Sequence, residues 1–150
     1  MLENIKSILG IELVEVNFQK LFLNVFDKNL NGLKIAQISD LHINKWNKGL
    51  IEETIDKVNS LKPDIITITG DIICNGKKFI PDLVFLFKQL KSKYGIYACL
   101  GNHDHSDGED GKRVIKAYND SDIRILVNES EVLQLDGGKI QVAGADDFEL

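Results

Sequence analysis

Three short polar motifs, each placed directly after a hydrophobic run, constrain the fold of this chain more than any other feature. They are Asp-Leu-His at residues 40–42, Gly-Asp at residues 70–71 and Gly-Asn-His-Asp at residues 101–104. The motifs follow one another at intervals of about thirty residues, the length of one strand–loop–helix unit. Because the carboxyl ends of parallel strands meet at one edge of a sheet, we expect the three motifs to lie side by side there.

The chain after residue 32 alternates between short apolar runs and stripes with helical periodicity. Each of three apolar runs is followed by a polar loop and then by a helical pattern, which predicts an α/β fold with a parallel sheet. A fourth short strand and a hairpin around Asp-Gly-Gly complete the pattern. The predicted strands are residues 33–38, 64–69, 95–100 and 123–127, with hairpin strands at 132–135 and 140–143; the predicted helices lie near residues 50–61, 83–90 and 112–119.

Residues 1–32 are predicted to form a separate N-terminal β extension, and residues 33–150 the main domain. Alternating apolar positions predict two strands near residues 13–18 and 21–25. The helical spacing of the first residues fits a short amphipathic helix that packs on its own domain, with attachment to a membrane surface as the alternative.

Composition excludes several classes of function. The net charge of −5 leaves no basic face with which to neutralise nucleic-acid phosphates, so no nucleic-acid partner is expected. No apolar run is long enough to span a bilayer, and no signal-peptide pattern opens the chain. Two cysteines are too few for a disulfide framework. These features favour a cytoplasmic location.

The motif residues themselves predict a divalent metal site. In an extended segment, residues two apart point to the same side, so Asp40 and His42 could bind one ion. Asp71 emerges one strand away, where its two oxygens could bridge two ions, and Asn102 supplies an amide oxygen. Taken singly, Asp40 could instead cap its loop and Asp71 could be an ordinary turn residue. Their order, each after a buried strand, makes a metal site the better interpretation.

The motifs resemble those of the calcineurin-like metallophosphoesterases. Ser-Asp-Leu-His at residues 39–42, Thr-Gly-Asp at 69–71 and Leu-Gly-Asn-His-Asp at 100–104 are similar to the first three motifs of that family. Lys-Pro-Asp-Ile-Ile at 62–66 and Val-Ala-Gly-Ala-Asp-Asp at 142–147 are similar to its bacterial, often membrane-associated branch. The resemblance implies a β-sandwich flanked by helices, of which this chain would carry the N-terminal half. It also implies hydrolysis of phosphomonoesters, phosphodiesters or pyrophosphates.

The same resemblance implies a role for each metal-binding residue. Asp40, His42 and Asp71 would hold one divalent ion, and Asp71 would bridge to a second ion bound by Asn102. Mixed nitrogen and oxygen ligands suit Mn, Fe or Zn better than Ca. The expected cofactor is therefore a pair of divalent metal ions, and the expected partner is a phosphoester substrate.

Two further residues of the third motif would be catalytic by this resemblance. His103 would protonate the leaving group or stabilise the transition state, because imidazole titrates near neutral pH. Asp104 would orient His103. The nucleophile would be hydroxide, formed from a water shared by the two ions.

The chain also departs from the family. Complete members add an isolated His and a Gly-His-x-His motif, and the histidines of this chain, His42, His103 and His105, leave those positions unfilled. We therefore expect a truncated domain whose sheet keeps an exposed apolar face. It would be weakly active alone or completed by a complementary C-terminal half; the alternative is a non-catalytic remnant that binds another protein. The resemblance to the membrane-associated branch adds peripheral membrane attachment as an alternative location.

Several residues near the motifs keep open interpretations. His105 is expected to be a solvated loop imidazole. Trp46 could contact substrate or pack over the start of the following helix, with equal weight for each. Asp146 and Asp147 could line the site or form the turn that ends the last strand, again with equal weight. Cys74 is expected to be a buried loop thiol.

Overall fold

The computed structural model describes residues 14–23, 28–73, 76–105 and 111–147, and its centre is a four-stranded parallel sheet. The strands stand side by side in the order β1-β2-β3-β4. Their bounds are β1 Ile35–Ile38, β2 Ile65–Thr69, β3 Ile96–Cys99 and β4 Arg124–Ile125. Each strand pairs in parallel with its neighbour, so the predicted α/β class with a parallel sheet is confirmed.

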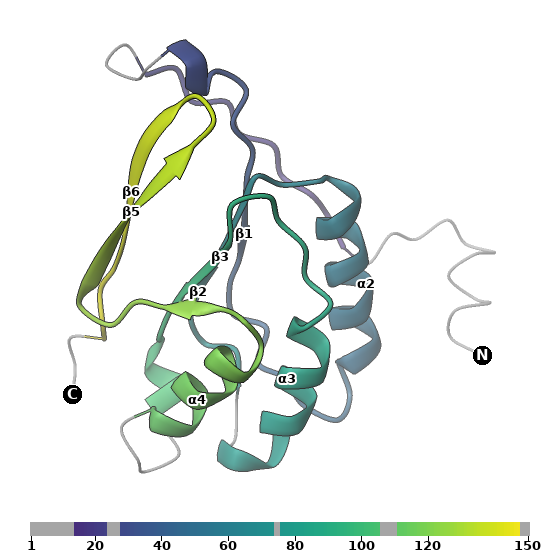
Figure 1. The fold of residues 1–150 in the computed structure, drawn as a ribbon. Helices are drawn as coiled ribbons and strands as arrows, with labels where there is room; N and C mark the ends of the chain where they lie inside the picture. Colours follow the sequence, from purple (N-terminus) through teal and green to yellow (C-terminus); the bar gives the residue numbers. More distant parts are fainter. Residues whose placement is uncertain (1–13, 24–27, 74–75, 106–110, 148–150) are drawn as a thin grey trace, which may run out of the picture.

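Three helices connect the strands and cover one face of the sheet (Figure 1). They are α2 Lys48–Ser60, α3 Ile80–Phe87 and α4 Lys112–Asp120; single 3-10 turns lie at η1 Lys28–Leu30, η2 Gly76–Phe79 and η3 Asn102–His105. The helix α2 ends where Lys62 takes a left-handed φ of 49° and Pro63, which has no N–H to donate, follows.

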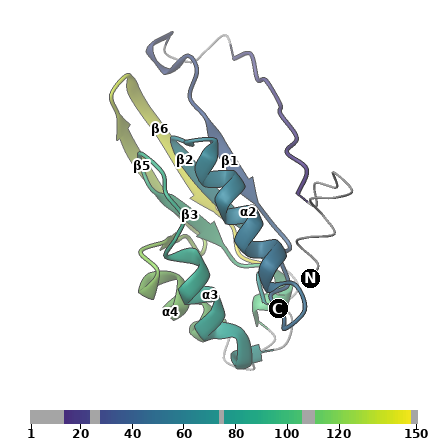
Figure 2. The same cartoon turned by 90° about the vertical axis from the view of Figure 1, so that its right-hand side faces the viewer.

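The antiparallel hairpin of β5 Glu129–Leu135 and β6 Gly138–Gly144 lies on the opposite face of the sheet (Figures 1 and 2). Figure 1 shows the hairpin and α2 on opposite sides of the sheet. The molecule therefore has three layers, namely helices, parallel sheet and hairpin, which is the arrangement that buries both faces of a parallel sheet.

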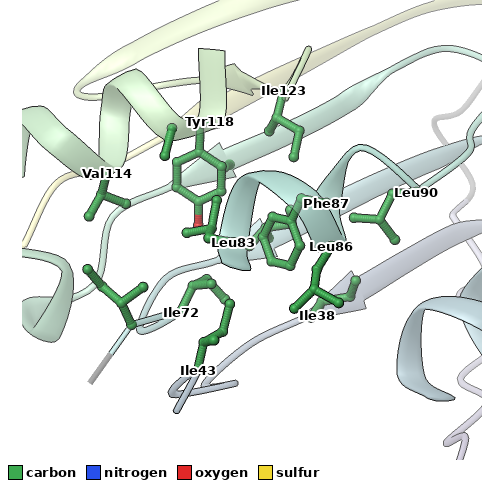
Figure 3. Packing of buried hydrophobic residues seen from close by; sticks show 14 of the residues in the cluster. Ile38, Ile43, Ile72, Leu83, Leu86, Phe87, Leu90, Val114, Tyr118 and Ile123 are labelled. Atoms are coloured by element: carbon green, nitrogen blue, oxygen red, sulfur yellow. The ribbon is translucent and has the colours of Figure 1, made fainter. Parts of the chain in front are cut away.

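The main core fills the space between the sheet and the helices. Tyr118 of α4 and Phe87 of α3 are fully buried there, with ring centroids 6.1 Å apart (Figure 3). The apolar stripes of α3 and α4 close on the Ile-rich strand β2, in which alternate residues face the helices. This packing fixes the strand ends from which the polar motifs emerge.

A smaller core lies under the hairpin. Tyr97 of β3 packs with Leu133 and Leu135 of β5, and Ile65 of β2 completes the contact. The hairpin thus covers part of the face that was expected to be exposed. Ile35 on the edge strand β1 remains 56% exposed, and Val132 on the outer face of the hairpin is 60% exposed, so apolar exposure persists at both places.

The predicted N-terminal β extension, residues 1–32, is described over residues 14–23 and 28–32; residues 14–23 run without joining either sheet, and residues 28–30 form the turn η1. Its apolar side chains Phe18, Leu21 and Phe22 are largely exposed. The predicted amphipathic helix lies outside the described residues, as does Cys74. Within the part of the chain that is described, no helix has the length and apolar character needed to cross a membrane.

Candidate active site

The three motifs meet at the carboxyl ends of β1, β2 and β3, where the first loop continues the parallel pairing beyond the strand. The amide of Asp40 donates to the carbonyl of Gly70 at 3.1 Å, and that of His42 donates to the carbonyl of Asp71 at 3.1 Å. The amide of Ile43 then donates to the carbonyl of Ile72 at 2.7 Å. These bonds carry the side chains of the first motif across to the second.

Three residues of the first two motifs have an unusual backbone conformation. The φ angles of Asp40, His42 and Asp71 are 54°, 44° and 55°, in the left-handed region that residues other than glycine rarely occupy. Such conformations cost about 1–3 kcal/mol each and persist where the surroundings hold them, which is common at functional sites. The left-handed turns redirect these side chains at the strand ends.

Two glycines let the second and third loops touch through their backbones. A Cβ at Gly70, whose φ is 86°, would lie 2.7 Å from the Cα of Gly101. A Cβ at Gly101 would lie 2.6 Å from the amide nitrogen of Asp71. Neither position has room for a side chain, so glycine at both is required for the contact.

The contact gathers metal-binding groups from all three loops. Ligand atoms of His42, Asp71 and His103 all lie within 4.8 Å of one another. The His42 and His103 rings meet edge to face, with centroids 4.8 Å apart, and the amide of His103 donates to Oδ1 of Asp71 at 2.9 Å. Two imidazoles and a carboxylate at this spacing are a donor set that suits a divalent transition metal.

The polar groups beside Asp71 fit a cation at this point. The side-chain amide of Asn102 reaches the two carboxylate oxygens of Asp71 at 3.2 and 3.1 Å, and its nitrogen donates to both in the orientation that satisfies these groups. In addition, Nδ1 of His42 is buried and has no hydrogen-bond partner among the described residues. The residues present therefore fit a divalent ion.

Asp40 is placed differently from the other predicted ligands. Its residue is exposed, its carboxylate accepts a hydrogen bond from the Ser39 hydroxyl, and it is not one of the three residues whose ligand atoms cluster. The structure thus brings His42, Asp71, Asn102 and His103 together and leaves the Asp40 carboxylate at the rim.

Asp104 is fully buried and has a role other than the one expected for it. Its carboxylate accepts hydrogen bonds from the backbone amides of Asp71, Ile72, Ile73 and Gly101, at 2.9, 3.1, 3.3 and 3.0 Å respectively. Burial raises the pKa of the Asp104 carboxyl, and the four amides oppose that shift. Both oxygens are occupied by backbone groups, so Asp104 ties the second loop to the third instead of orienting the His103 ring.

His105 is not the solvated imidazole that the sequence suggested. Its side chain is 5% exposed, and Nε2 lies 2.9 Å from Oδ1 of Asp146. Asp146, two residues after the end of β6, therefore packs against the third loop. The two residues are 41 positions apart, and no local sequence pattern links them.

Trp46 is 84% exposed, so packing over the start of α2 is wrong for this residue. The side chains of two asparagines hold its loop. The side-chain NH2 group of Asn44 donates to the carbonyl of His42, and the side-chain NH2 group of Asn47 donates to the carbonyl of Leu41. The Lys45 ammonium lies 4.4 Å from the centre of the indole ring. The loop thus holds a cation and an aromatic ring in solvent a few residues from His42.

Comparison with known proteins agrees with this geometry. The sequence model of the calcineurin-like phosphoesterases matches residues 33–148. The chain is 41% identical to the UDP-2,3-diacylglucosamine pyrophosphatase LpxG of Chlamydia trachomatis over 80 residues, which are 52% of this chain and 24% of that protein. It is 30% identical to the uncharacterized metallophosphoesterase YkuE of Bacillus subtilis over 92% of this chain and 49% of the relative.

A structural relative gives a weaker match. The crystal structure of the phosphopantetheinyl hydrolase PptH from Mycobacterium tuberculosis superposes with a TM-score of 0.49 and 19% identity, over 74% of this chain and 41% of that one. The chain spans about half or less of the length of each relative named. With its motif residues gathered at one sheet edge and its family match extending over residues 33–148, the chain belongs to the calcineurin-like phosphoesterase family.

Proposed function

We propose that this chain forms the metal-binding half of a phosphohydrolase, which hydrolyses phosphoester or pyrophosphate bonds with a pair of divalent ions. The observation that carries the proposal is the convergence of His42, Asp71 and His103, whose ligand atoms lie within 4.8 Å of one another. Membership of a family of phosphoesterases supports the same reaction class.

The proposed metal ligands come from all three loops. His42 and Asp71 would hold one ion, and the Asp40 carboxylate at the rim would join them only with its side chain turned inward. The side-chain amide of Asn102 lies 3.1–3.2 Å from the Asp71 carboxylate oxygens, and with its oxygen turned toward a second ion this pair would form the start of a second site. Ions bound at such a centre lower the pKa of a water and neutralise charge on phosphoryl oxygens. Mn, Fe and Zn are the metals that this mixture of nitrogen and oxygen donors favours.

His103 is proposed to act on the leaving group. Its backbone amide donates to Asp71, and its imidazole lies within the cluster, next to the proposed ligands His42 and Asp71. An imidazole protonated near neutral pH can donate its proton to the departing oxygen, which then leaves as a neutral hydroxyl or a less charged phosphate.

The substrate class we favour is a pyrophosphate that joins two larger groups. Support comes from the relative named a UDP-2,3-diacylglucosamine pyrophosphatase, to which 80 residues of this chain are 41% identical. The exposed Trp46 and Lys45 add a planar apolar surface and a positive charge close to the first motif. Such a pair suits a substrate that carries both a ring and a phosphate.

The test combines Mn²⁺ titration by calorimetry with hydrolysis of bis-p-nitrophenyl phosphate, on the chain alone and with the C-terminal half of a relative added. We expect Asp71→Asn to lower Mn²⁺ affinity by about a hundredfold, because it removes a ligand charge shared by both sites. His103→Ala should leave Mn²⁺ affinity within about threefold and reduce turnover by about a hundredfold or more.

The matched control is Asp136→Asn, a change of the same chemistry at the far end of the hairpin, which should alter neither quantity. A chain that binds Mn²⁺ but hydrolyses no phosphoester, even with the second half present, would contradict the proposed activity. It would favour the non-catalytic alternative. Loss of Mn²⁺ affinity in His103→Ala would make His103 a ligand and not an acid.

A further inference from the structure

A partly buried histidine–carboxylate pair joins the third loop to the end of the C-terminal hairpin. The His105 side chain is 5% exposed and that of Asp146 is 20% exposed, with Nε2 and Oδ1 separated by 2.9 Å. A carboxylate only accepts hydrogen bonds when ionised, so Nε2 of His105 carries the proton of this bond. The pair lies outside the cluster of ligand atoms formed by the other two histidines.

The hairpin end that supplies Asp146 is itself held in place. The Asp146 amide donates to Oδ1 of Asn128 at 3.1 Å, and Asn128, with a φ of 53°, precedes the first hairpin strand. Oδ1 of Asp146 also accepts the amide of Asp147 at 3.0 Å. Both ends of the hairpin therefore fix the carboxylate that reaches His105.

The other partner belongs to η3, one short turn that also carries Asn102 and His103. Three consecutive residues of this turn are anchored: the His103 amide to Asp71, the Asp104 carboxylate to backbone amides, and the His105 ring to Asp146. A single 3-10 turn has no length over which to absorb a displacement, so movement at its last residue shifts its first.

We propose that His105 and Asp146 are positioning residues, which hold η3 so that Asn102 and His103 face Asp71. The pair gives the β5–β6 hairpin a part in the site, although no hairpin residue lies in the ligand cluster. The consequence for metal binding rests on the proposed function; the effect on the geometry of η3 does not. A merely structural pair would instead stabilise the whole fold without a particular effect at His103.

Amide hydrogen exchange of the metal-free protein separates these two roles. The His103 amide reports on η3, and the Ile66 amide, which donates to the carbonyl of Gly95 at 3.2 Å, reports on the sheet. In His105→Ala and in Asp146→Ala we expect the protection of His103 to fall about tenfold while that of Ile66 stays unchanged. Asp146→Asn keeps an acceptor oxygen and should restore most of the protection.

Asp136→Ala is the control, since it breaks an exposed ion pair with Lys93 at the other end of the same hairpin. It should leave both amides unaffected. A fall of equal size at His103 and Ile66 would overturn the proposal and leave a general stabilising role. Unchanged exchange at His103 in both alanine variants would overturn it as well.

Mn²⁺ affinity provides the second measurement. Each single variant should bind about tenfold more weakly, and the double variant no more weakly than either, because both changes remove one interaction. Additive losses in the double variant would contradict a shared role. A wild-type chain that binds Mn²⁺ without hydrolysing phosphoester would contradict the proposed function, while the exchange of His103 would still decide the role of the pair.

Discussion

The two ends of the parallel sheet are built from the same elements but differ in how their polar groups are held. At the carboxyl end, Asp104 and His105 are buried and every oxygen of Asp104 accepts a backbone amide. At the amino end, Lys93 and Asp136 form a 2.6 Å ion pair whose side chains are 55% and 77% exposed. Both ends bring the hairpin to the sheet. Among the described residues, a fully buried carboxylate binds four backbone amides at the carboxyl end. The side-chain bonds that hold loop backbone at the amino end, such as Asp64 to the Lys34 amide and Ser92 to the Gly95 amide, are exposed or half-buried.

The difference between the two ends of the sheet explains why the carboxyl end can hold catalytic and metal-binding groups in fixed positions. A buried carboxylate bonded to several amides loses much when one partner moves, and so it holds neighbouring groups within a narrow range of positions. An exposed ion pair contributes little and tolerates movement. Substitutions at the two ends of the sheet should therefore differ in the size of their effects.

Gly101→Ala should disrupt the carboxyl end most severely. The added methyl group would lie 2.6 Å from the amide nitrogen of Asp71, against backbone that cannot rotate away. We expect a loss of about 3 kcal/mol in the free energy of unfolding and at least a tenfold loss of Mn²⁺ affinity, measured by urea denaturation and calorimetry. The matched control is Gly49→Ala in α2, where no atom lies within 4 Å and alanine favours the helix. Equal effects in the two variants would contradict a special contact at Gly101.

Asp104→Asn should have the second largest effect. Asparagine keeps the shape but replaces one acceptor oxygen with a donor, which would face backbone amides in a buried site. We expect a loss of about 2 kcal/mol in the free energy of unfolding, measured by urea denaturation. Asp40→Asn is the control, because Asp40 is exposed and asparagine tolerates its left-handed backbone. The free energy of unfolding of the Asp40→Asn variant should differ from that of wild type by less than about 0.5 kcal/mol.

Breaking the Lys93–Asp136 ion pair should change the stability of the protein least, and the change should depend on pH. The hydrogen bond from Lys93 lowers the pKa of Asp136 below the usual range of aspartate. A carboxyl group whose pKa falls on folding stabilises the protein above its unfolded pKa, and that contribution is lost as pH falls through the lowered value. Thermal unfolding of Asp136→Asn should therefore match wild type at strongly acidic pH and differ slightly near neutral pH.

High salt should remove the small difference that Asp136→Asn shows near neutral pH, because exposed pairs are screened. A difference that grows toward low pH would have the wrong sign for this pair. A large difference at neutral pH would contradict the contrast between the two ends of the sheet.

The periodicity of the sequence predicted most of the fold. The observed strands β1, β2 and β3 fall inside the predicted ranges, because short apolar runs separated by helical stripes leave few arrangements other than a parallel sheet. The long strands of the hairpin were predicted shorter than they are, since their outer positions carry polar residues such as Glu129 and Ser130 that give no apolar signal. The strands predicted before residue 24 do not form over residues 14–23.

The sequence predicted the site residues that belong to a motif. It did not predict contacts between residues that are far apart in the chain. His42, Asp71, Asn102 and His103 come together as their strand positions require. The sequence could not show that Asp104 turns inward to the backbone of the second loop, because amides carry no residue-specific signal. It also could not pair His105 with a carboxylate 41 residues away.

The hydrogen bonds of Asp104 have a consequence for how the protein folds. They join its carboxylate to amides that lie up to 33 positions away in the chain, on the neighbouring strand's loop. A short peptide that contains the third motif lacks those amides, and closing so long a loop before the sheet forms is entropically unfavourable. Metal binding should therefore develop together with the parallel sheet during refolding, with no binding-competent fragment formed in advance.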